Sequence, residues 1–109
     1  MAYNKRIESR IKNIVAAWKN TDYKNMFGGI CHLINGNMFC GVYKDFLILR
    51  LGQENADLAL DLPFVRPFDI TGRPMKGWVM VAEEGFSTDN ALEDWLTQAR
   101  DFACTLPPK

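Results

Sequence analysis

The chain has 109 residues, which is enough for one small domain with its own core. A hydrophobic content of 48% with no net charge excludes intrinsic disorder. The 13 basic and 13 acidic residues cancel, so we do not expect direct nucleic-acid binding. Residues 1–109 are therefore expected to form a single domain.

Charge is distributed unevenly along the chain. Residues 1–25 have six bases and two acids, a local charge of +4, and residues 82–109 have six acids and two bases, a local charge of −4. Two solvated helix faces of opposite sign account for this pattern. A weak basic patch for an acidic partner is the alternative, and the face over residues 5–19 would then be the site.

Targeting signals and metal motifs are not expected. The chain has no apolar run near roughly 18 residues and no apolar stretch behind its basic N-terminus, so we expect neither a transmembrane helix nor a signal peptide. The cysteines, Cys31, Cys40 and Cys104, are odd in number and form no C-x-x-C motif, so no metal or cofactor is expected. These features predict a cytoplasmic protein with free thiols.

Helical periodicity appears first at the N-terminus. An apolar stripe predicts a helix over residues 4–19, with Glu8 among the charged residues off the stripe, and a turn at 20–22. Asn35-Gly36 predicts a type I′ hairpin between strands at 26–34 and 37–43. Lys44-Asp45 predicts a second turn into a strand at 46–51.

The second half of the chain alternates between helix and strand signals. Residues 53–60 are expected to form a short helix, residues 66–70 and 76–81 two strands, and residues 87–103 a helix with capping side chains at its start, including the capping-box pair Asn90 and Glu93. The order α-βββ-α-ββ-α predicts an α+β fold of two layers, a five-stranded antiparallel sheet with helices on one face.

The hairpin turns fix an expected register. They place on one face an apolar set, Cys31, Leu33, Met38, Cys40, Val42, Leu47, Leu49 and Leu51. The opposite face would display the aromatic and polar residues His32, Phe39, Tyr43, Phe46 and Arg50, a hypothetical protein-interaction surface or homodimer contact. The alternative is a third layer formed by a loop, or a partly solvated sheet with scattered hydrophobic residues. Cys31 would pair with Cys40, as two buried apolar residues or as a redox-active pair.

Catalytic motifs do not appear in the sequence. There is no nucleophile elbow, P-loop or zinc-protease motif, and the lone His32 is expected to be structural or at an interface. Three bases, Arg66, Arg73 and Lys76, could hold an anion in the loop between the last two strands, although a structural role for this loop is favoured.

The chain contains several distinctive motifs. They are Met26-Phe27-Gly28-Gly29, Asn35-Gly36-Asn37-Met38, Cys40-Gly41-Val42, Arg66-Pro67-Phe68-Asp69-Ile70-Thr71-Gly72-Arg73-Pro74-Met75-Lys76-Gly77-Trp78 and Leu106-Pro107-Pro108-Lys109. Together these motifs resemble the N-terminal domain of the TfoX/Sxy family of bacterial competence regulators, and the resemblance covers essentially the whole chain.

The resemblance implies a two-layer fold similar to secretion chaperones and no catalytic residues. It also implies a partner, because full-length regulators of this family act with the cyclic-AMP receptor protein at competence promoters. Those regulators have a helical C-terminal domain, which we expect this chain to lack, since it stops at Lys109.

Two functions follow from the sequence. The first is a non-enzymatic interaction module, a regulatory adaptor for competence or transcription that acts through protein contacts. The alternative is a small-ligand or anion-binding domain that uses the loop over residues 66–76. An enzyme is not expected.

Overall fold

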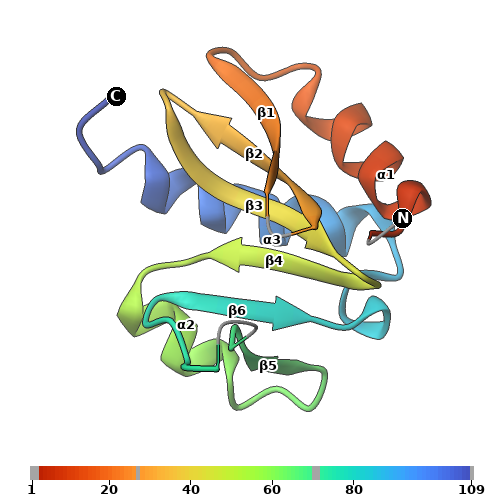
Figure 1. The fold of residues 1–109 in the computed structure, drawn as a ribbon, viewed down its shortest axis with the longest axis vertical. Coiled ribbons are helices and arrows are strands. Elements are labelled where there is room, and N and C mark those ends of the chain that lie inside the picture. The colour runs from red at the N-terminus through yellow and green to blue at the C-terminus, as the bar shows by residue number, and fades with distance from the viewer. Residues whose placement is uncertain (1–2, 27, 70–71, 109) are drawn as a thin grey trace.

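A computed structural model describes residues 3–26, 28–69 and 72–108. The elements in chain order are α1 (Lys5–Val15), β1 (Thr21–Met26), β2 (Gly29–Ile34), β3 (Asn37–Tyr43), β4 (Phe46–Arg50), α2 (Gln53–Ala59), β5 (Val65–Pro67), β6 (Trp78–Val81), the 3₁₀ helix η1 (Glu83–Phe86) and α3 (Asp89–Ala103). The strands form one antiparallel sheet in the order β1-β2-β3-β4-β6-β5 (Figure 1). The α+β prediction is confirmed, but the sheet formed by the described residues has six strands, not five.

The strand that the sequence did not predict is β1. Its residues were expected to form a turn at 20–22 and the start of a longer strand at 26. The side chains from Asp22 to Asn25 are exposed, so the segment has no apolar alternation from which to recognise a strand. Pairing with β2, from Thr21 opposite Ile34 to Met26 opposite Gly29, makes it one.

The predicted hairpin is correct at its turn and wrong further along. Asn35 and Gly36 have φ values of 53° and 82°, as a type I′ turn requires, and Leu33 pairs with Met38 as expected. The register then shifts, so that His32 pairs with Cys40 instead of Phe39. A β-bulge of this kind places one extra residue, Phe39, opposite the partner strand.

The bulge changes which residues of β2 meet the helices. Ile30 and Ile34 now join the main core, whereas Cys31 and Leu33 point to the other face. The expected apolar face is therefore correct for Cys40 and for Val42, Leu47, Leu49 and Leu51, and wrong for Cys31, Leu33 and Met38.

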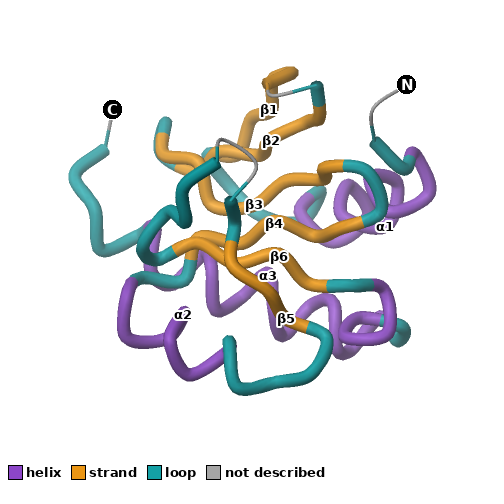
Figure 2. Tube along the Cα trace, turned by 60° about the horizontal axis from the view of Figure 1, so that its bottom comes forward, coloured by secondary structure: helices purple, strands orange, loops and turns teal. Residues whose placement is uncertain are grey.

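All three helices contribute to one core against this face. Figure 1 shows α3 running behind the strands, and Figure 2 shows the same arrangement turned by 60°. The helical core residues are Ile7, Ile11, Val15, Ala56, Ala59, Leu92, Trp95, Leu96, Ala99 and Ala103. The predicted two layers, with helices on one face of the sheet, are thus confirmed.

Side chains cap the two long helices. Asn4 accepts hydrogen bonds from the Arg6 and Ile7 amides at the start of α1. At the start of α3 the cap is Thr88, whose hydroxyl accepts from the Ala91 amide at 3.1 Å. The expected pair of Asn90 and Glu93 does not provide the cap, because α3 begins one residue before Asn90.

The uneven charge along the chain is partly neutralised within the fold. Arg6 lies 3.6 Å from Glu83, and Arg10 lies 3.3 Å from Asp89. Arg10 also donates to the Phe86 carbonyl oxygen at 2.8 Å. The basic helix α1 therefore lies against the acidic segment that begins α3.

No helix among the described residues is long and apolar enough to cross a membrane.

Candidate interaction surface

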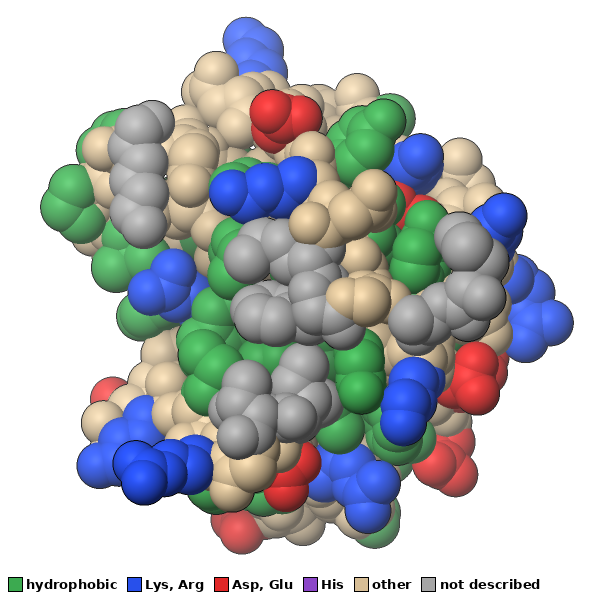
Figure 3. All heavy atoms as spheres, in the orientation of Figure 1, with side chains coloured by type: hydrophobic (Ala, Val, Ile, Leu, Met, Phe, Trp, Pro, Cys, Tyr) green, Lys and Arg blue, Asp and Glu red, His purple; other side chains and the backbone are tan. Residues whose placement is uncertain are grey.

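The sheet face opposite the helices has a small hydrophobic cluster of its own. Ile48, Phe68 and Met80 are buried there. Partly buried hydrophobic side chains pack around them, namely Tyr43, Phe46, Met75 and Trp78. Figure 3 looks onto this helix-free face and shows hydrophobic side chains gathered near its middle with lysine and arginine side chains around them. We call Tyr43, Phe46, Ile48, Arg50, Arg66, Phe68, Met75, Trp78 and Met80 the open face.

Cations lie over the aromatic rings of the open face. The Arg66 guanidinium lies 5.6 Å from the centroid of the Phe46 ring. Arg50 lies 5.6 Å from the Trp78 ring and 5.7 Å from the ring of Phe102 in α3. Such contacts hold the charged groups close to apolar surface. The result is a mixed aromatic and arginine surface, which is typical of protein interfaces.

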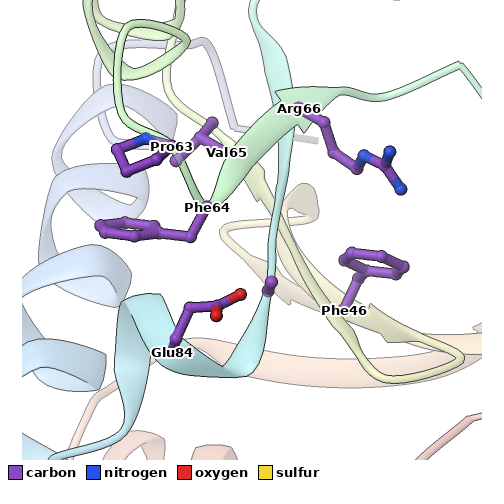
Figure 4. A pocket seen from close by; sticks show the side chains of 7 residues that line it. Phe46, Pro63, Phe64, Val65, Arg66 and Glu84 are labelled. Atoms are coloured by element: carbon purple, nitrogen blue, oxygen red, sulfur yellow. The ribbon is translucent and has the colours of Figure 1, made fainter.

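A hollow of about 260 Å³ adjoins the open face where β5 begins. Figure 4 shows Phe46 and Arg66 on one side of it and Phe64 and Glu84 on the other. Pro63, Val65 and Ala82 complete the lining. An apolar floor between one guanidinium and one carboxylate fits an apolar side chain of a polypeptide, whose backbone and flanking groups could meet the two charges.

Three of the five residues predicted for an interaction face lie on the open face in the structure. Tyr43, Phe46 and Arg50 belong to the open face and are half-buried. His32 and Phe39 do not belong to it, because the bulge turns them toward the helices, where they are 2% and 0% exposed. The prediction for these two residues is therefore wrong. Phe39 packs on Trp18, with ring centroids 5.9 Å apart.

His32 forms a buried pair with Glu8 of α1. Its Nε2 lies 2.7 Å from Glu8 Oε1, and Glu8 is only 5% exposed. The second oxygen, Oε2, has no hydrogen-bond partner among the described residues, although Lys12 Nζ lies 3.9 Å away. Glu8 was expected off the apolar stripe, but its spacing to Ile11 and Val15 places it on the stripe. His32 is therefore structural, which is one of the two roles expected from the sequence.

The thiols differ in environment. Cys31 pairs with Gly41, and Cys40 pairs with His32, so the two sulfur atoms point to opposite faces of the sheet. Burial raises the pKa of the Cys31 thiol, which Lys24 partly offsets. Burial raises the pKa of the Cys40 thiol well above its usual value, and the Glu8 carboxylate adds to this shift. The expected side-by-side cysteine pair is wrong, and the redox hypothesis loses the geometry on which it depended.

A family model, the TfoX N-terminal domain, matches residues 13–103 of the chain. The chain belongs to the TfoX N-terminal domain family. This confirms the resemblance inferred from the motifs. The family is associated with competence regulation and is not a known enzyme family. No curated protein matches the chain significantly.

Motif residues of this TfoX N-terminal domain make close backbone contacts with other segments of the chain. The Gly77 carbonyl oxygen accepts from the amides of Leu51 and Gly52 at 2.8 and 3.2 Å. Gly29 lies so close to the Val42 carbonyl oxygen that a Cβ atom would collide with it. Phe27, Ile70, Thr71 and Lys109 of the motifs lie outside the described residues, as does the Met26 side chain.

In this TfoX N-terminal domain, the motif over residues 66–78 also covers part of the sheet on the open face. The Met75 amide donates to the Phe68 carbonyl oxygen at 3.0 Å, which closes the loop. Phe68 packs on Trp78, with ring centroids 5.7 Å apart. These contacts give the described part of the loop a structural role, the role that the sequence favoured.

The three bases of the predicted anion site lie in two segments, one in β5 and one after Gly72. Arg66 lies in β5 over Phe46, whereas Arg73 and Lys76 are exposed in the segment after Gly72. Residues 70 and 71, between these positions, lie outside the described part of the chain. Anion binding by Arg66, Arg73 and Lys76 stays a prediction.

Proposed function

We propose that the chain is a non-enzymatic interaction module that binds a protein partner through its open face. The observation on which this depends is the hydrophobic cluster left without a helix, bordered by Arg50 and Arg66 stacked on aromatic rings. Arginine and aromatic residues are enriched at the centres of protein interfaces, where they contribute much of the binding energy.

The hollow beside Phe46 makes the proposal more specific. An apolar side chain of the partner would enter between Phe46 and Phe64, and Arg66 and Glu84 would meet polar groups at its rim. Because anchor residues in pockets dominate protein association, truncating Phe46 should reduce binding more than truncating an exposed residue elsewhere.

Family membership supports a regulatory role for this contact. The family is associated with competence regulation. We propose an adaptor in competence or transcription whose partner is a transcription regulator such as the cyclic-AMP receptor protein. The module would act inside the cytoplasm, through protein contacts and without direct binding of DNA.

The experiment is an affinity capture from native lysate, with and without nuclease, by three purified proteins. These are the wild type, Phe46→Ala in the hollow, and the control Leu58→Ser, which changes a side chain that is 64% exposed on α2. We expect one partner captured by the wild type and the control regardless of nuclease, and lost with Phe46→Ala. Equal capture by all three proteins would exclude the open face, and loss of the partner with nuclease would indicate nucleic-acid binding.

A further inference from the structure

The two edges of the sheet differ in the hydrogen bonds they can offer. On the β5 edge, the Val65 amide already donates to the Leu62 carbonyl oxygen at 3.2 Å, and Pro67 has no amide hydrogen. That edge is closed to another strand. The β1 edge is six residues long and contains no proline.

The backbone of β1 shows which residues face outward. The Asn20 carbonyl oxygen accepts from the Asn35 amide, so residues alternating with it, Asp22 and Lys24, pair inward with β2. The Tyr23 amide instead donates to the Asp22 side chain at 2.8 Å. Thr21, Tyr23 and Asn25 therefore direct their amides and carbonyls to the free edge.

The sequence of this edge is complementary to itself. If two copies pair antiparallel about Tyr23, Tyr23 meets Tyr23, and Thr21 meets Asn25 of the other copy, through the outward groups. Asp22 then lies opposite Lys24 of the other copy, twice, at positions where cross-strand side chains are closest. Tyr23 is 54% exposed in the single chain, although it is one of its large hydrophobic residues.

We propose that β1 is an interface for a second copy of this chain, which extends the sheet across a two-fold axis at Tyr23. Each Asp22 carboxylate exchanges its bond to the Tyr23 amide for an ion pair with Lys24 of the other copy. Asp22 thus covers the edge in the single chain and aligns the register in the dimer. This inference is independent of the open face, which lies on the surface of the sheet and not at its edge.

A charge-swap experiment tests the register. Sedimentation is measured over a range of protein concentrations for the wild type, Asp22→Lys, Lys24→Asp, the double variant, and an equimolar mixture of the two single variants. Each single change places like charges opposite each other, and should weaken dimerisation about tenfold or more. The double variant and the mixture restore opposite charges and should dimerise as the wild type does.

Asp57→Lys is the control, since it makes the same charge change at an exposed position on α2. Hydrogen exchange gives a second readout, because protection of the Asn25 amide should rise with protein concentration. A wild type that stays monomeric, or a dimer unaffected by both single variants, would overturn the proposal. So would a dimer that leaves the exchange of Asn25 unchanged.

Discussion

Alternate residues of strand β4 lie on the two faces of the sheet, and their environments differ. Leu47 and Leu49 of β4 point into the helical core and have no exposed surface. Phe46 and Arg50 point to the open face, where the cover is a loop and where side chains remain half-buried. The main core therefore lies on the helix-covered face, and the open face is the one that we propose for a partner.

The largest expected difference is between two phenylalanines, one on each face. Phe39→Ala should lower the free energy of unfolding by about 3–5 kcal/mol, because it empties a fully buried site beside Trp18. Phe46→Ala should cost roughly 1 kcal/mol, since this ring is already partly exposed. Urea unfolding measures both, and equal losses would contradict the distinction between the faces.

The second effect concerns the buried pair on the helix-covered face. Glu8→Ala leaves His32 without its partner and should cost about 3 kcal/mol of stability. A double-mutant cycle with His32→Ala measures the coupling between the two side chains. Losses that simply add would show that the 2.7 Å contact does not stabilise the fold.

The third effect is a pH dependence that arises from the same face. The pKa of Cys40 is raised in the folded protein, so the unfolded chain loses this proton first as the pH rises above the usual value of 9.0. The free energy of unfolding therefore has its full value below this pH. Above this pH it should fall by up to about 1.4 kcal/mol per pH unit.

The matched variant is Cys40→Ala, in which the alkaline decrease should become shallower. Equilibrium unfolding between about pH 7.5 and about pH 10.5, roughly 1.5 units either side of the usual value of 9.0, compares the slopes. Identical slopes of unfolding free energy against pH in the wild type and Cys40→Ala would contradict a raised pKa of the Cys40 thiol.

The smallest effect is on the open face. Arg50→Met keeps an apolar stem but removes the cation between Trp78 and Phe102, so it should cost about 1 kcal/mol or less. Thermal unfolding of Arg50→Met beside Arg50→Lys separates the charge from the planar guanidinium. A loss of several kcal/mol would mean that this face is part of the core.

Much of the fold could be predicted because turns and apolar periodicity are local signals. Asn35-Gly36 predicted the correct turn, and the stripe from Ile7 to Val15 predicted the helix, which ends at Val15 and not at residue 19. β1 could not be predicted, since an exposed polar strand is defined by its partner. The bulge at Phe39 was equally hidden, because no turn residue marks its position in the sequence.

The candidate site was predicted only in part for the same reason. Phe46 and Arg50 follow a regular turn, so their face was correct. His32 and Phe39 lie beyond the bulge, and one extra residue reversed their assignment. The contacts of Arg66 with Phe46, and of Phe64 with the hollow, join segments distant in sequence that no local pattern relates.

Photo-crosslinking tests the role of the open face most directly. p-Benzoylphenylalanine is placed at position 46 in the hollow, or at position 58 on α2 as the control, and the protein is irradiated in its native lysate. The expected result is one discrete crosslinked protein from position 46 that also persists after nuclease treatment, and none from position 58. The same product from both positions, or none from position 46 while the wild type still captures a partner, would contradict an interface on the open face.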